Sequence, residues 1–195
     1  MADTTRLEPL DRASGVGEER EPMETKPSGQ VINGIDVSGF LESCKAARSN
    51  PSLLERRPTV VARWIGGTRA EIKSGDVVSY AGGKGELNPM RMLLGALAAC
   101  DVDVIATHAA ALGVSIEELW VEATGHFNAR AYLGLADDPG SGYDAITYTV
   151  HLRAPGLTPE QAAALRRRCE RGSPVGDSLT RRIPVTLQFE TEQKK

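Results

Sequence analysis

The sequence predicts an α+β protein in which antiparallel sheet packs on a long, buried central helix. Three observations support this prediction. A long apolar run with helical character begins at Asn88-Pro89, segments rich in β-branched and aromatic residues lie on both sides of it, and a capped helix begins near Thr158. Because strands and helices come in separate runs rather than in strict alternation, antiparallel sheet is favoured over parallel sheet.

The first part of the chain is predicted to lie outside the main domain. Residues 1–30 are polar, charged and turn-rich, which is typical of a disordered or loosely attached arm. Residues 31–58 form a helical N-terminal extension in this prediction, with Asp36 or Ser38 as its cap and Asn50-Pro51 as its end. Its apolar residues at helical spacing are Ile35, Val37, Phe40, Leu41, Cys44 and Ala47.

The main domain, residues 59–195, opens with predicted sheet. Residues 59–65 are β-branched and aromatic and indicate a strand, and 66–68 supply a turn. Residues 69–80 continue as a second strand or hairpin arm. A glycine-rich connection at 81–87 follows, and it lacks the spacing of a phosphate-binding loop.

The central helix carries clear start and stop signals. Asn88 is a good N-cap, Pro89 is tolerated at the first helical position, and Gly113 is a natural stop. The first half is apolar on every side, so we expect it to be sunk in the protein. Small residues would let a second helix approach closely; these are Gly95, Ala96, Ala98 and Ala99.

The remaining elements follow from the same patterns. Strands are expected at 119–130 and 146–152, separated by a turn-rich segment at 131–143. Residues 158–161 form a capping box that begins a helix at about 159–171. The segment 173–175 is expected to turn the chain, and 185–189 to close the domain as a strand.

Composition limits the classes of function. The chain has 195 residues, a formal net charge of −3 and 41% hydrophobic residues. These values fit a globular protein and give no reason to expect nucleic-acid binding. The run 92–111 is interrupted by Asp101, Asp103 and His108, so no membrane span is expected, and the N-terminus lacks an apolar signal segment. We therefore expect a cytoplasmic protein.

The cysteine and histidine content does not indicate a metal or disulfide framework. The three cysteines, Cys44, Cys100 and Cys169, are few and odd in number, which fits a reducing compartment. No pair of ligands has metal-binding spacing, so we expect neither a metal nor an organic cofactor. Cys44 lies on an apolar helical stripe and is interpreted as a buried, inert thiol.

The central run resembles the signature helix of the OsmC/Ohr family of osmotically inducible and organic hydroperoxide resistance proteins. Members carry an Asn/Ser-Pro start, an alanine-rich apolar helix and a cysteine at the place of Cys100. The resemblance covers roughly residues 59–190, and 31–58 resemble an extension found in one branch. It implies an intertwined homodimer of antiparallel sheets around paired central helices.

The resemblance also implies a reaction. Catalytic members reduce a hydroperoxide with two cysteines: the first becomes a sulfenic acid, the second closes a disulfide, and a dithiol reductant restores both. Cys100 matches the first cysteine. Ser173, before Pro174, stands where the second belongs, and Cys169 lies one helical turn earlier and could replace it.

Other family positions match less closely. Met90 stands where the activating glutamate follows Asn-Pro, and Glu86 lies nearby in the preceding loop. The family arginine corresponds to Arg69, offset by one residue, or alternatively to Arg63. The candidates for substrate binding in an apolar pocket are Ser173, Met90 and Leu97.

The chemistry of Cys100 depends on its surroundings. A thiol among alanines and leucines is inert unless a cation reaches it, and an arginine from the first sheet could supply that charge. The residues alone favour an inert core cysteine, and the resemblance favours a reactive one. Asp101 and Asp103 lie on other faces of the helix, where pairing with solvent or at an interface is favoured over acid–base chemistry.

Two hypotheses of different class follow. The first is a thiol-dependent peroxidase, or a related thiol redox protein, that acts through Cys100 on an organic hydroperoxide. The second is a non-catalytic dimeric protein that binds a small hydrophobic ligand on the same fold, which the absence of the glutamate and of the second family cysteine favours.

Overall fold

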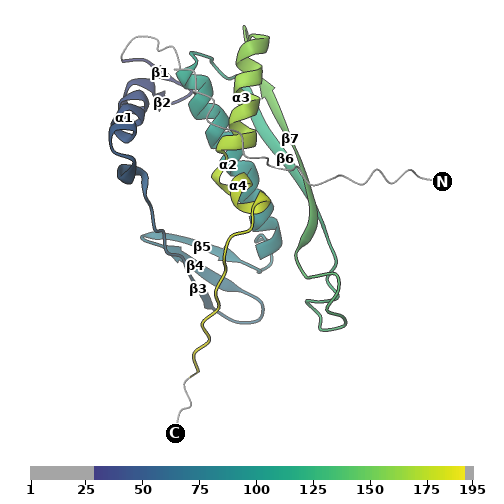
Figure 1. The fold of residues 1–195 in the computed structure, drawn as a ribbon. Helices are drawn as coiled ribbons and strands as arrows, with labels where there is room; N and C mark the ends of the chain where they lie inside the picture. The colour runs from purple at the N-terminus through teal and green to yellow at the C-terminus, as the bar shows by residue number, and fades with distance from the viewer. Residues whose placement is uncertain (1–28, 192–195) are drawn as a thin grey trace, which may run out of the picture.

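A computed structural model describes residues 29–191 as helices and antiparallel sheets (Figure 1). The α+β class predicted from the sequence is therefore confirmed, with antiparallel pairing in every sheet. The elements, in order, are β1 Val31–Ile32, β2 Ile35–Asp36, α1 Val37–Ser49, the 3-10 helix η1 Pro51–Leu54, β3 Val61–Trp64, β4 Ala70–Ser74, β5 Val77–Ala81, α2 Pro89–Ala111, β6 Glu118–Phe127, β7 Tyr143–Arg153, α3 Pro159–Gly172 and α4 Pro174–Thr180.

Helix α2 runs through the middle of the chain in Figure 1, with α1 on one side and the β6–β7 hairpin on the other. Helices α3 and α4 pack along it, and the β3–β4–β5 sheet lies beyond its N-terminal end. The predicted caps hold: the Asn88 side chain accepts from Arg91 N, and Gly113 adopts a positive φ of 72° after the last turn.

The core gathers around the second half of α2. Val104 and Ile105 pack with Cys169 of α3, and Ala109 packs with Val114 and Leu165. By contrast, the first half is covered on one side only, with Gly95, Ala96 and Ala99 exposed. The expectation that this half is sunk on every side is therefore wrong for the single chain, because no element of residues 29–191 covers that face.

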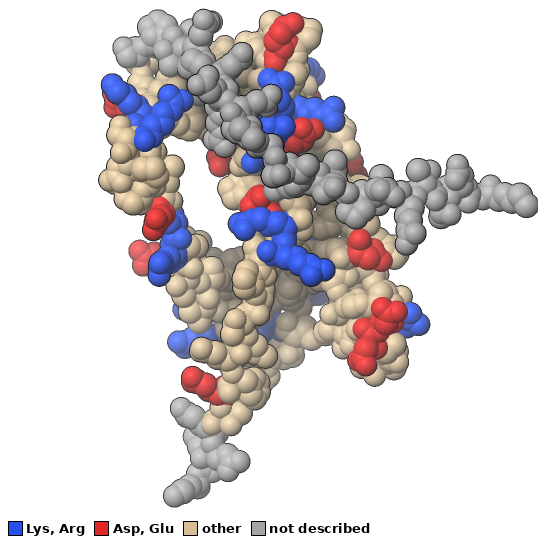
Figure 2. All heavy atoms as spheres, in the orientation of Figure 1, with Lys and Arg blue, Asp and Glu red and all other residues tan. Residues whose placement is uncertain are grey.

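Helix α2 is also long and apolar enough to cross a membrane by length and composition, and 28% of its most apolar window is buried within the chain. The same measure is met by core helices of globular proteins, and α2 contacts β6, α3 and α4. On the face shown in Figure 2, acidic and basic side chains are interspersed.

The extension at 31–58 contains a hairpin that the helical periodicity did not reveal. Asn33 and Gly34, with φ of 53° and 77°, form the tight turn between β1 and β2. The helix begins only at Val37, capped by Asp36, and ends at the predicted Asn50. Of the predicted arm at 1–30, residues 1–28 lie outside the described part of the chain.

Two further expectations were wrong in detail. The segment 69–80 is not one strand, because a turn at Gly75, with φ of 56°, divides it into β4 and β5. The segment 173–175 does not simply turn the chain: Ser173 caps the short helix α4.

The predicted closing strand at 185–189 is extended but unpaired in this chain. Its apolar side chains are open to solvent, with Val185 89%, Leu187 82% and Phe189 83% exposed. No strand among the described residues lies beside it, so the predicted strand does not form within the single chain.

Candidate active site

Cys100 lies in the middle of α2, half-buried, where the helix meets the junction of α3 and α4. The nearest polar group is the hydroxyl of Ser173, which donates to Cys100 Sγ at 3.4 Å. Ser173 is 2% exposed, so this contact is shielded from water. The Ser173 hydroxyl therefore places a fixed hydrogen-bond donor at the Cys100 sulfur.

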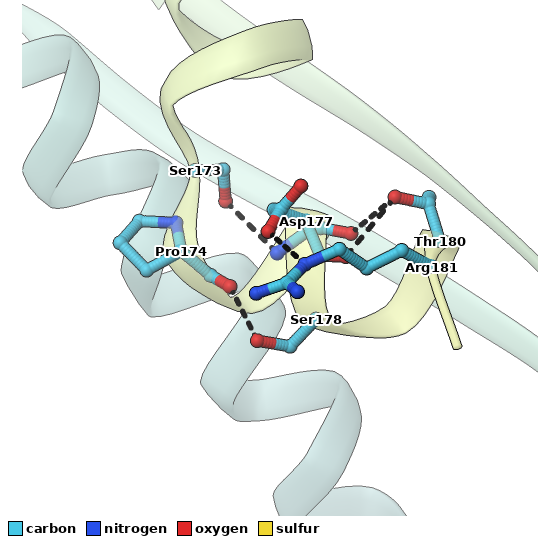
Figure 3. Close-up of polar contacts among 7 residues, drawn as sticks. Ser173, Pro174, Asp177, Ser178, Thr180 and Arg181 are labelled. Atoms are coloured by element: carbon cyan, nitrogen blue, oxygen red, sulfur yellow. Dashed lines mark hydrogen bonds and ion pairs between the residues drawn. The ribbon is translucent and has the colours of Figure 1, made fainter. Parts of the chain in front are cut away.

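Ser173 is held in place by the start of α4. Its Oγ accepts from Gly176 N at 3.2 Å, and Figure 3 shows the polar contacts that stabilise the helix around it. Ser178 Oγ donates to the Pro174 carbonyl at 2.8 Å, and Arg181 Nε pairs with Asp177 Oδ2 at 2.5 Å. The short helix therefore fixes the hydroxyl that faces Cys100.

The second thiol, Cys169, lies on α3 one helical turn before Ser173 and is 8% exposed. Burial, followed in size by the neighbouring charges of Asp101, Glu170 and Cys100, raises the pKa of Cys169 to about 12. Cys169 is therefore a protonated thiol near neutral pH. The two sulfurs belong to two packed helices, as the sequence predicted, but their environments differ.

Asp101 is the least expected member of this cluster. It is 0% exposed, and neither carboxylate oxygen has a hydrogen-bond partner among the described residues. Burial, followed in size by the Asp101 carboxylate, raises the pKa of Tyr148 on β7 to about 12. The Tyr148 hydroxyl does not form a hydrogen bond of acceptable geometry with either oxygen of Asp101. The expectation that Asp101 pairs with solvent is wrong; Asp103 is exposed as expected.

Arg69 and Glu86 form an ion pair at the other end of α2. Glu86 Oε1 accepts from Arg69 Nε at 2.8 Å, Oε2 accepts from Gly83 N at 2.9 Å, and the guanidinium stacks 4.8 Å from the centre of the Tyr80 ring. The hydrogen bonds between them raise the pKa of Arg69 and lower that of Glu86. The Glu86 carboxylate thus holds the loop at 82–87 in place through its bonds to Arg69 and Gly83.

This ion pair is separated from the thiols. Glu86 precedes α2, whose first residue lies roughly 16 Å along the helix axis from Cys100 at about 1.5 Å per residue. Among the described residues, the side-chain hydrogen bonds of Arg69 go to Glu86. Arg63 is exposed on β3, opposite Glu71 in register. The single chain does not show either arginine in contact with Cys100.

Some of the remaining predicted site residues lie beside Cys100, and one lies at the other end of α2. Leu97 is 3% exposed and packs at the start of α4, close to Ser173 and Gly176. Met90 lies half-buried in the first turn of α2, where its carbonyl accepts from the Tyr143 hydroxyl at 2.9 Å. Leu97 and Ser173 therefore lie beside Cys100, and Met90 does not.

A groove of about 450 Å³ lies between α3 and β7 and reaches the cluster from the Cys169 side. Its walls are mainly apolar, with Arg166 and Glu170 at its edge paired at 2.7 Å. The lining of the groove does not include Cys100, Met90, Leu97 or Ser173. The lining residues are Ile105, Tyr148, Val150, Leu152, Leu157, Ala162, Leu165, Arg166, Cys169 and Glu170. Within residues 29–191, no three potential metal ligands cluster.

A family model described as OsmC-like protein matches residues 82–188, more than half of the chain. The chain belongs to the OsmC family. The OsmC match covers α2, Cys100, Cys169 and Ser173, and it confirms the resemblance read from the sequence.

Solved structures support the OsmC fold. An OsmC-like protein from Mycoplasma pneumoniae is 17% identical, with a TM-score of 0.55, and the match covers 65% of this chain and 89% of that one. An OsmC-like protein of unknown function from Vibrio cholerae is 11% identical, with a TM-score of 0.53 and coverages of 64% and 94%. A putative osmotic stress induced and detoxification response protein from Psychrobacter arcticus is 17% identical, with a TM-score of 0.51 and coverages of 64% and 90%. No curated protein matches the chain.

Three side chains, two beside the thiols and one in the separate ion pair, escaped the sequence interpretation in whole or in part. Asp101 carried a signal, since a carboxylate within an apolar run next to a cysteine is costly unless it serves a purpose. Glu86 was noticed, but its ion pair with Arg69 depends on the fold of the loop. Tyr148 carried no signal, because strand alternation alone does not show which ring approaches a helix.

Proposed function

We propose that this OsmC protein reduces organic hydroperoxides through Cys100. The Cys100 thiolate attacks the hydroperoxide, the O–O bond breaks, and the products are the alcohol and a sulfenic acid on Cys100. Cys169 then closes a disulfide with loss of water, and a dithiol reductant restores both thiols. The observation that carries the proposal is the buried Ser173 hydroxyl, which donates to Cys100 Sγ at 3.4 Å and so places a polar donor beside the reacting sulfur.

The difference between the thiols supports this order of events. Cys100 is half-buried and has a hydroxyl donor, whereas burial and the Asp101 carboxylate keep the pKa of Cys169 at about 12. A thiolate is the attacking species in both steps, so Cys100 reacts first and Cys169 second. Leu97 and Ser173 beside Cys100 would contact the substrate.

In this proposal, Glu86 performs the role of the family glutamate, whose position in this chain is occupied by Met90. It forms two polar contacts, with the Arg69 guanidinium and with Gly83 N, and so fixes the arginine in one orientation. A guanidinium held in this way can stabilise a thiolate and the departing alkoxide. Arg69 is favoured over Arg63 because Arg69 is the arginine that the carboxylate orients.

A homodimer is part of the same proposal. Two surfaces of the single chain favour a second copy: the face of α2 with Gly95, Ala96 and Ala99, and the extended apolar segment at 185–189. Apolar area of this extent is usually covered in soluble proteins. The second copy would bring α2 against α2 and offer the segment a strand to pair with, and Arg69 would then act from the assembled site. A cytoplasmic location, without membrane or nucleic acid, completes the proposal.

Thiol titration tests the proposed reaction. The reduced protein in a Cys44→Ser background is mixed with one equivalent of cumene hydroperoxide, and free thiols are counted over time. We expect loss of two thiols per chain, with no loss in Cys100→Ser and accumulation of a trappable sulfenic acid in Cys169→Ser. Intact thiols in the parent at this stoichiometry would rule out the peroxidase.

The groove between α3 and β7 favours a second candidate, a non-catalytic protein that binds a small hydrophobic ligand. Its size and apolar lining suit such a ligand. This function would be favoured if the protein binds a fluorescent fatty acid and its thiols stay intact in the presence of a hydroperoxide. Ala162→Trp, which adds bulk to the wall of the groove, should then abolish the binding.

A further inference from the structure

A buried carboxylate stands beside the two thiols without a partner of its own. Asp101 is 0% exposed, and neither oxygen receives a hydrogen bond from any described residue. Leaving a buried carboxylate unpaired is strongly destabilising in proteins. Such a cost is expected at functional sites rather than in a structural core.

Asp101 lies beside groups on two other elements. The pKa values of Cys169 on α3 and Tyr148 on β7 both respond to its charge. Cys169 packs against Val104 and Ile105, which follow Asp101 by three and four residues and so share its face of α2. Among these groups, Cys169 and Tyr148 are the protonated ones that feel its charge most directly. Arg166, the nearby cation at the groove, is already paired with Glu170 at 2.7 Å. The Asp101 carboxylate is therefore free to accept a proton from the Cys169 thiol.

We infer that Asp101 is the base for the second thiol: it accepts the proton of Cys169 when Cys169 forms a disulfide with Cys100. This inference rests on the proposed function and deepens it. The carboxylate becomes a carboxylic acid, and the Cys169 thiolate attacks Cys100 Sγ. The S–O bond of the sulfenic acid breaks, and the departing hydroxide takes the proton from Asp101 and leaves as water. Cys169 is oxidised and the sulfenic sulfur is reduced by the same amount.

The arrangement explains how a thiol that is protonated at rest can react second. Burial and the Asp101 charge together raise the pKa of Cys169 to about 12, so Cys169 does not compete with Cys100 for the hydroperoxide. The same carboxylate receives the proton when the sulfenic acid forms next to it. Asp101 thus helps to keep Cys169 protonated while the hydroperoxide reacts, and it accepts the Cys169 proton when the disulfide forms.

The test replaces the hydroperoxide by an aromatic disulfide, dithiobis(nitrobenzoate), so that it does not depend on peroxidase activity. In a Cys44→Ser background, Cys100 attacks the reagent and releases one nitrothiobenzoate. Cys169 then attacks the mixed disulfide on Cys100 and releases a second. Stopped-flow absorbance gives the rates of both phases for the parent, for Asp101→Asn and for the exposed control Asp103→Asn.

We expect two phases in the parent, with a second-phase rate that stays nearly flat between about pH 7 and 9. Asp101→Asn should leave the first phase within twofold and slow the second at least tenfold at pH 7, with recovery of about tenfold per pH unit as hydroxide takes over. Asp103→Asn should change neither phase. An unchanged second phase in Asp101→Asn, or a parent that releases only one nitrothiobenzoate, would overturn the inference.

The parent's own pH profile keeps the test decisive even if Asp101→Asn folds poorly. A second phase that rises tenfold per pH unit in the parent would show that no internal base acts on Cys169. If the hydroperoxide leaves the thiols intact while the Asp101 effect on the second phase holds, the proposed function fails and the inference about Asp101 stands.

Discussion

At the scale of single residues, the two sulfurs differ in their surroundings. Cys100 is half-buried and accepts from a hydroxyl at 3.4 Å, whereas burial, followed by the Asp101 charge, raises the pKa of Cys169. The family resemblance ranked Cys100 first and Cys169 second, but residue types alone could not, because these surroundings come from α3, α4 and β7. Ser173 was taken for a lost cysteine, and the structure shows it donating to the very sulfur that the cysteine would have met.

The first residue-scale prediction restores that cysteine. Ser173→Cys places a thiol where an oxygen now lies 3.4 Å from Cys100 Sγ, so the two sulfurs need little movement to reach bonding distance. We expect a disulfide between Cys100 and the introduced cysteine to form within minutes on mild oxidation, measured by non-reducing peptide mapping. Ser173→Ala is the control, and a disulfide between Cys100 and Cys169 that forms in preference in the Ser173→Cys variant would contradict the geometry.

Alkaline pH should reveal the shifted pKa values of Cys169 and Tyr148. The pKa values of Cys169 and Tyr148 are raised to about 12 from ordinary values of 9.0 and 10.0. Both groups favour their neutral forms when folded, so their contribution to stability is complete below about pH 9 and is lost as pH rises toward 12. Urea unfolding should show stability falling over this range, and the fall should be smaller in Cys169→Ala. A flat profile would contradict these pKa shifts.

At the scale of elements, the caps and turns were the most predictable features. Asn88, Thr158, Asp36 and Gly113 perform the roles that their types suggest. Elements whose form depends on partners were predicted less well. Helix α4 was interpreted as a turn because its seven residues carry little periodicity. Strands β4 and β5 were merged because only the two-residue turn Gly75-Asp76 separates them. The Asn33-Gly34 turn signal was present and was outweighed by the helical spacing that continues past it.

The N-cap of α2 offers a stability prediction for the element that carries Cys100. Asn88 Oδ1 accepts from Arg91 N at 2.8 Å, and removing such a cap costs about 1 kcal/mol. Asn88→Ala should lower the free energy of unfolding by about that amount in urea titrations. Asn88→Asp keeps the acceptor and should stay within about 0.5 kcal/mol of the parent. Equal losses in both variants would show that the cap is not the cause.

At the scale of the whole molecule, the proposed second copy would cover apolar surface that the single chain leaves exposed. The first half of α2 was predicted to be sunk in the protein and the segment at 185–189 to close the domain as a strand, and neither holds within the single chain. Sequence periodicity indicates that a face is apolar but not which chain covers it. The fold class was therefore predictable from the sequence, and the homodimer remains a proposal.

Bulk added to the exposed face of α2 should separate the two copies. A Cβ at Gly95 meets no atom within 4 Å, so Gly95→Leu fits within the single chain but would block a closely packed second helix. Sedimentation equilibrium should show a dimer for the parent and a monomer for Gly95→Leu. Ala163→Leu, which adds similar bulk at an exposed position of α3, should remain dimeric; a dimeric Gly95→Leu would place the interface elsewhere.

The most direct measurement is the identity of the disulfide that one equivalent of organic hydroperoxide produces. The reduced full chain is treated with cumene hydroperoxide, quenched with an alkylating agent and mapped by non-reducing peptide mass spectrometry. We expect a cross-link between the peptides of Cys100 and Cys169, with Cys44 alkylated and the hydroperoxide converted to its alcohol. Alkylation of all three cysteines, with the hydroperoxide unconsumed, would contradict a reaction through Cys100.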